Sequence, residues 1–321
     1  MLSVVALGAC PGGGVPGVPG KSKAASDVDP NTCGNYAASD VGKKLKAFLQ
    51  ATVMFNDAVL EAEAEMKVSC TAMASELGVS TEGDTATVCN AVAESIKEHL
   101  SVGLKGGAAL TINYEPAVCT VSVEAAASAA ASCEGLASAE VSATCQGTCQ
   151  GTCSGDCIGD NSGGQCNGTC QGTCEGECQG NASVDASAEC EANAEVSANV
   201  EAECTEPSLE VAFEAEMVVD APKVEAVKSA LIKGMPKMLQ LKAYAEGPLA
   251  ATFITWSKTA KALAGDTVRL ARSLEDQAQC VGGQLAGAAG MVAAIKASLD
   301  VQVEVSVSVS ASASAEGSAG N

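Results

Sequence analysis

The spacing of the cysteines is the feature that most constrains how this chain can fold. Four Cys lie four residues apart between Cys145 and Cys157, and four more do so between Cys166 and Cys178. If the chain turns back between Asn161 and Ser162, every one of them meets a partner, and the two residue numbers of each pair add up to 323. Two Cys pairs outside the dense array obey the same rule. The predicted disulfides are Cys157–Cys166, Cys153–Cys170, Cys149–Cys174, Cys145–Cys178, Cys133–Cys190 and Cys119–Cys204. The symmetry predicts an antiparallel hairpin of constant register.

Side-chain periodicity indicates that the arms of this hairpin are strands. Small or apolar residues take almost all odd positions from 117 to 157 and the even positions from 166 to 204, with polar residues between them. A period of two is typical of a β-strand. In this register glycine faces glycine between the Cys, as Gly147–Gly176, Gly151–Gly172 and Gly155–Gly168. Disulfides would stabilise a ribbon that is otherwise unstable in water.

Helix is the alternative for the Ala-rich parts of the arms. The Ala-rich stretch 124–132 favours helix, and the Cys119–Cys133 and Cys190–Cys204 gaps fit two heptads of an antiparallel helical pair. Against this, the glutamates between 189 and 203 would scatter around a helix. Glycine at every fourth position of the Cys array would cost a helix about 1 kcal/mol each. We therefore favour strands in both arms.

Charge divides the chain into two kinds of segment. The net charge is −21, yet residues 106–222 contain 19 acidic residues and no Lys or Arg, so the remaining body is close to neutral. This imbalance argues against nucleic-acid binding, which needs clustered basic residues. An anionic appendage on a near-neutral body is expected.

The body is predicted to be helical. Apolar residues follow helical spacing after a cap at Ser39/Asp40, from Asp40 to about Leu77; further helices are expected at 84–100, 222–245 and 248–299, the last broken near Gly265 and Gly282. Strands at 110–114 and 209–213 continue the mirror register at the base of the hairpin. Of the remaining Cys, Cys70–Cys89 can join the first two helices, which leaves Cys33–Cys280. Val301 to Ala315 alternate with polar residues, which predicts a further strand. The expected fold class is α+β, a helical bundle with a long disulfide-linked β-hairpin.

The apolar stretch at the N-terminus ends with Leu7-Gly8-Ala9-Cys10. This resembles the bacterial lipobox, and the resemblance implies a lipoprotein lipidated at Cys10 and held to a membrane through that lipid. The stretch is shorter than usual and lacks a basic start. The expected segments are a truncated lipoprotein signal (1–10), a Gly/Pro-rich tether (11–38), the first helical part (39–105), the acidic hairpin (106–220), the second helical part (221–298) and a strand with an Ala/Ser tail (299–321).

Cysteine usage and the scarcity of catalytic residues limit the chemistry. With Cys10 set aside, sixteen Cys remain, an even number that predicts disulfides formed in an oxidising compartment. Metal binding by thiolates is the less favoured alternative, and no cofactor is expected. The chain has a single His, His99, and no nucleophile–base pair or phosphate loop, so we do not expect an enzyme.

These expectations combine into one interpretation. The chain is expected to be a bacterial envelope lipoprotein of the outer membrane, periplasmic or surface-exposed, with a stiff anionic β-spike that serves as a spacer, surface fibre or assembly element. The alternative is an adhesion or ligand-binding module that contacts a protein or glycan through the hairpin tip or the helical body. Exposed strand edges would also allow self-association.

Overall fold

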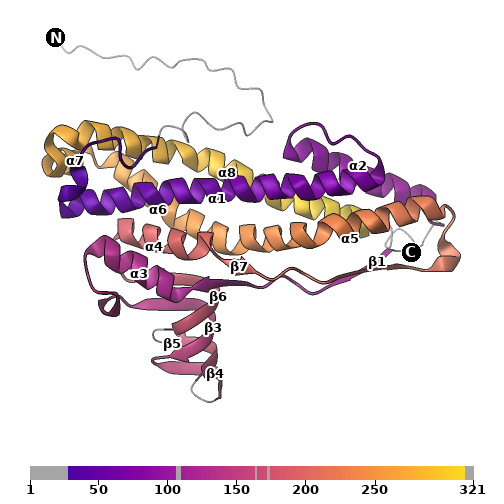
Figure 1. Cartoon of the computed structure of the whole chain (residues 1–321), viewed down its shortest axis with the longest axis horizontal. Helices are drawn as coiled ribbons and strands as arrows, with labels where there is room; N and C mark the ends of the chain where they lie inside the picture. Colours follow the sequence, from indigo (N-terminus) through magenta and orange to yellow (C-terminus); the bar gives the residue numbers. More distant parts are fainter. Residues whose placement is uncertain (1–27, 106–109, 163–164, 172–173, 315–321) are drawn as a thin grey trace, which may run out of the picture.

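The computed structural model describes residues 28–105, 110–162, 165–171 and 174–314 (Figure 1). Long helices lie side by side as an elongated body, and an antiparallel sheet projects from one side of it. The fold is therefore α+β, as the sequence predicted. The helices of the body are α1 (Asp40–Leu77), α2 (Thr85–Gly103), α5 (Ala221–Tyr244), α6 (Ala250–Gly265), α7 (Thr267–Leu274) and α8 (Ala278–Ser314).

Helix α1 is the central element, because α2, α4 (Ala188–Val200), α5 and α8 all pack against it. It begins where Ser39 accepts a hydrogen bond from the backbone N–H of Gly42 at 3.1 Å, and it ends at Gly78, which has a φ of +68°. Glycine adopts this left-handed conformation without the steric cost that a side chain would add. Both ends of the helix are thus set by local sequence.

The single tryptophan lies in one of the two hydrophobic clusters of the body. Trp256 of α6 is fully buried and meets Phe55 of α1 edge to face at 5.3 Å between ring centroids. Its indole N–H donates to the Thr52 hydroxyl at 2.9 Å. Two of the largest buried side chains of the chain, Trp256 and Phe55, therefore pack directly against each other.

The C-terminal strand predicted at 299–321 is wrong for the described part, because α8 continues through it to Ser314. Gln302, Val305 and Val309 lie on one face of the helix and are buried in the body. The hydroxyls of Ser306 and Ser310 donate to carbonyls four residues earlier, at 2.8 and 2.7 Å. Burial on one helical face therefore outweighs the strand preference of the alternating valines. The predicted break near Gly282 is also absent, whereas α6 does end at Gly265.

Helix α8 also has the composition of a membrane span. The stretch Arg272–Ser312 is long and apolar enough to cross a bilayer by length and composition alone. Of its 18-residue apolar window 28% is buried, and α8 packs against α1, α2 and α6. We therefore describe it as a helix of the body.

The ribbon at the base of the appendage has the predicted register. Strand β1 (Leu110–Tyr114) pairs with β8 (Leu209–Phe213), so that Leu110 lies across from Phe213 and Ile112 from Val211. Farther out, β2 (Cys119–Ser122) and β7 (Glu203–Cys204) keep this register, with Cys119 across from Cys204.

Beyond Ser122 the Ala-rich arms are helices, so the strand prediction for them is wrong. Helix α3 (Val123–Glu134) is capped by the Ser122 hydroxyl and ends at Gly135, and α4 (Ala188–Val200) packs against it. Alanine's helix propensity and the local caps decide the outcome. Of the glutamates between 189 and 203, Glu189 and Glu195 are buried in the helical packing, whereas Glu201 and Glu203 are exposed.

The outer appendage is a sheet of short strands rather than one long hairpin. Its strands are β3 (Ala143–Cys153), β4 (Asp156–Ser162), β5 (Gln165–Gln171) and β6 (Cys174–Val184). Together with β2 and β7 they form a six-stranded antiparallel sheet in the order β4-β5-β3-β6-β2-β7. Because β3 pairs with both β5 and β6, the ribbon folds back on itself, and the appendage is a short stack instead of a straight rod (Figure 1).

The end of the predicted tether belongs to the body. Residues 28–38 pack against α8 and α1: Val28 and Tyr36 are buried, and the Asp29 N–H donates to the Gln284 side chain at 2.6 Å. The predicted signal (1–10), with Cys10, and the tether as far as residue 27 lie outside the described residues.

Candidate functional site

The disulfides of the appendage form a staggered ladder. In the β3–β6 pair, Cys149 lies across from Cys178 and Cys153 across from Cys174. The sulfur of Cys149, however, is bonded to Cys174, and that of Cys153 to Cys170. Each bond thus reaches a Cys one repeat away from the residue directly opposite, with Cα atoms 5.5–6.0 Å apart along the ladder.

The structure brings together every Cys pair that the sequence indicated. The eight disulfides are Cys33–Cys280, Cys70–Cys89, Cys119–Cys204, Cys133–Cys190, Cys145–Cys178, Cys149–Cys174, Cys153–Cys170 and Cys157–Cys166. They account for all sixteen Cys of the described residues, so these sulfurs offer no thiolate to a metal. Disulfides in this number indicate an oxidising environment, outside the cell or in its envelope.

The predicted glycine pairing is wrong by one repeat. Gly147 lies across from Gly180 and Gly151 from Gly176, instead of Gly176 and Gly172. A β-carbon on Gly151 would come within 2.1 Å of the Glu175 carbonyl oxygen, so no side chain fits at this crossing. Glycine is therefore required for the backbones to approach as closely as they do.

The sulfurs fill the inside of the stack, and polar residues cover the outside. Cys149, Cys174 and Cys178 are buried. The exposed neighbours that alternate with the Cys of β3, β5 and β6 are Thr148, Gln150, Thr152, Asn167, Thr169, Glu175 and Glu177. One large apolar side chain, Ile158 of β4, is 58% exposed near the tip. The outer surface therefore offers hydroxyl, amide and carboxylate groups without a basic residue.

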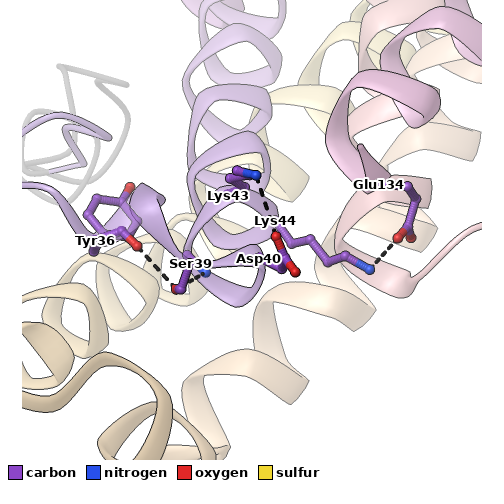
Figure 2. Close-up of polar contacts among 7 residues, drawn as sticks. Tyr36, Ser39, Asp40, Lys43, Lys44 and Glu134 are labelled. Atoms are coloured by element: carbon purple, nitrogen blue, oxygen red, sulfur yellow. Dashed lines mark hydrogen bonds and ion pairs between the residues drawn. The ribbon is translucent and has the colours of Figure 1, made fainter. Parts of the chain in front are cut away.

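A partly buried ion pair joins the appendage to the body. Lys44 of α1 reaches Glu134 at the end of α3 (Figure 2). The other oxygen of that carboxylate accepts the Ser187 N–H at 2.7 Å. Desolvation works against the charged carboxylate, but the hydrogen bonds from Lys44 and Ser187 outweigh it and lower the pKa of Glu134 to about 2. Glu134 thus connects α1, α3 and the start of α4, beside the Cys133–Cys190 disulfide.

Figure 2 also shows how the start of α1 is fixed next to this ion pair. The Ser39 hydroxyl donates to the Tyr36 carbonyl at 3.3 Å, and Lys43 pairs with Asp40 on the exposed side. Burial, with a contribution from Asp29, raises the pKa of Tyr36 to about 12, while its hydroxyl donates to the Pro30 carbonyl. The segment before α1 is therefore held by side-chain contacts as well as by Cys33–Cys280.

A second contact between appendage and body contains a buried acid. Glu195 of α4 is buried against α6, and desolvation followed by the nearby Glu191 raises its pKa to about 7, although Thr255 donates a hydrogen bond to it. One helical turn further on, the Asn199 amide donates to the Thr252 hydroxyl at 2.9 Å in a fully buried position. The α4–α6 contact therefore includes buried polar groups as well as apolar ones, and their proximity was not predicted from the sequence.

The body also contains an open groove, which the sequence analysis did not identify. It lies between α1 and α5, with the segment from the end of α4 to β7 as its floor, and has a volume of about 430 Å³. Its wall on α1 is acidic. The lining residues are Met54, Asp57, Ala58, Glu61, Ala62, Glu65, Val200, Ala202, Cys204, Lys237, Gln240, Leu241 and Tyr244.

Comparison with known proteins gives no further assignment. No protein family, no curated protein and no solved structure matches this chain.

Proposed function

We propose that this protein is an envelope-anchored structural lipoprotein of the outer membrane. Its helical body would present a stiff anionic appendage that acts as a spacer, surface element or assembly element. The observation that carries the proposal is the staggered ladder: four disulfides between Cys145 and Cys178 lock a sheet whose surface has no Lys or Arg. Disulfides at this density favour a rigid structural element.

Anchoring is proposed from the lipobox-like Leu7-Gly8-Ala9-Cys10. If Cys10 carries the lipid, residues 11–27 separate the membrane from the body and span at most about 60 Å. Both the helical body and the appendage would then lie outside the bilayer, with the body nearer to the membrane.

The experiment is expression in a bacterium with a labelled fatty acid, followed by membrane fractionation and free-thiol titration. We expect label on the native protein, none on a Cys10→Ser variant, and no free thiol before reduction. A soluble, unlabelled native protein would overturn the anchor, and several free thiols would overturn the ladder.

Stiffness is tested with a Glu-specific protease, because the appendage has no site for trypsin. Oxidised protein should resist cleavage at Glu175 and Glu177, and reduced protein should be cut at both. Equal cleavage rates with and without reductant would contradict a structural role for the disulfides.

A second candidate function is binding of a ligand or partner by the body. The groove between α1 and α5 favours it, because it combines an apolar floor with charged groups on the wall. Deletion of 158–165 removes the tip and leaves the groove, so the two surfaces can be tested separately.

A further inference from the structure

The groove between α1 and α5 has an apolar floor and one charged wall. Ala58, Ala62 and Leu241 contribute apolar surface, and Val200 and Ala202 close the bottom. The Tyr244 hydroxyl donates to the Val200 carbonyl at 2.6 Å and so fixes this floor against α5. The two helices lie side by side along the body (Figure 1), so the groove follows their direction.

The charged wall is a single stripe of carboxylates on α1. Asp57, Glu61 and Glu65 are four residues apart, so they lie on one face with a rise of about 6 Å between successive members. Burial of Tyr244, followed by the negative charge of Glu61 and Glu65, raises the pKa of its hydroxyl above the usual value. The negative charge of the stripe therefore affects groups inside the groove as well as those on its exposed side.

One of the three carboxylates already holds an aliphatic ammonium group. Lys237 of α5 lines the groove, and its Nζ lies 2.8 Å from Oε2 of Glu65. Asp57 and Glu61 form no ion pair with the described residues. The Lys237–Glu65 pair thus shows how an ammonium group can bind a carboxylate of this stripe. Asp57 and Glu61 could each bind a lysine of another molecule in the same way.

We propose that this groove binds an extended basic segment of a partner protein through lysine side chains at alternate positions. Alternate residues of an extended strand point to one side and are about 6.6 Å apart, which matches the rise between Asp57 and Glu61. The methylene stems would lie on the alanine and leucine floor, and the ammonium groups would reach the carboxylates. The proposal rests on the second candidate function and names its partner chemistry.

The test uses a fluorescent, terminally blocked peptide with Lys and Ser alternating, and fluorescence anisotropy on the full-length protein. We expect the Asp57→Asn/Glu61→Gln double variant to bind about tenfold more weakly. A peptide of the same composition with adjacent lysines should bind less well, and a Glu/Ser peptide should not bind. Higher salt should weaken all binding.

The matched control is Glu94→Gln/Glu98→Gln, which removes two exposed carboxylates four residues apart on α2, outside the groove. Because the protein carries a net charge of −21, a cationic peptide could bind anywhere on it. We expect the control to change affinity by less than about twofold. Equal losses in the control and the double variant, or equal binding of both lysine peptides, would overturn the proposal.

Oligomeric state decides between a partner protein and a second copy. A native dimer that the double variant converts to a monomer would place a lysine of another copy in the groove and would overturn the proposed occupant. Failure of peptide binding leaves the lipid label, the free-thiol count and the protease resistance unchanged, so it is distinguishable from failure of the structural function.

Discussion

Cys149 lies directly across the strand pair from Cys178, yet its disulfide joins it to Cys174, four residues earlier along β6. The residue opposite Cys149 in the strand pair and its covalent partner are therefore different residues. Because successive rungs repeat this offset, each disulfide overlaps the next along the sheet.

Removal of one rung should weaken the appendage without rearranging it. We expect Cys149→Ala/Cys174→Ala to lower the free energy of unfolding of the appendage by about 2–4 kcal/mol. Denaturant unfolding followed by hydrogen exchange of β3 and β6 measures this, and peptide mapping should find the other rungs unchanged. Exchanged partners among the remaining Cys would contradict the staggered arrangement.

A methyl group at a glycine crossing should disturb the ladder. Gly151→Ala places a β-carbon 2.1 Å from the Glu175 carbonyl oxygen, so we expect a loss of about 1–3 kcal/mol and a lower yield of oxidised protein. The matched control is Gly282→Ala in α8, where the added carbon meets nothing within 4 Å. There we expect a gain of up to about 1 kcal/mol in helix stability. Similar effects at both sites would show that the β3–β6 approach is looser than described.

Glu134 should make the junction sensitive to acid. Since the pKa of Glu134 falls to about 2 in the folded protein from an ordinary value near 4.5, its contribution is complete above about pH 4.5 and is lost as the pH falls toward 2. Glu134→Gln should reduce the pH dependence of thermal unfolding in that interval. A variant with the same slope as the native protein would show that the Lys44–Glu134 pair does not stabilise the junction.

Glu195 should act in the opposite direction. Its pKa rises to about 7 from about 4.5, so the folded protein binds the proton more tightly, and stability should fall as the pH rises between these values. Glu195→Gln should remove this decline and be the more stable form at pH 8. Thermal unfolding from pH 4 to 8 measures the slope, with Glu225→Gln, which removes an exposed carboxylate of α5, as the control. A native protein with constant stability over this range would contradict the burial of Glu195 against α6.

The disulfide partners could be predicted from the sequence, because each pair of Cys lies at equal distances from the turn and this needs no knowledge of the backbone pairing. The backbone register of the array could not, because the repeat is four residues long. A shift of four residues along the pair places Cys149 opposite Cys178 instead of Cys174, and glycine still meets glycine. The pattern is the same in both registers, so only the coiling of the ribbon selects one.

The misassigned helices have a different cause. Around Ala126 and Ala194 the period-two pattern is weak, because alanine is compatible with either structure, and the caps at Ser122 and Gly135 decide. In α8 the alternation is strong, but Val305 and Val309 find a core only as part of a helix. The acidic groove could not be predicted, because Glu61 and Lys237 come from helices far apart in the sequence.

The Cys33–Cys280 bond has a topological consequence. It closes a covalent ring between two Cys that are 247 residues apart in the sequence. Every other disulfide joins residues within that ring. A single cut of the backbone anywhere between these two Cys opens the ring but releases no fragment. A nicked molecule would keep its full mass until a reductant reached it, and damage to one loop would not detach the appendage from whatever holds the N-terminal end.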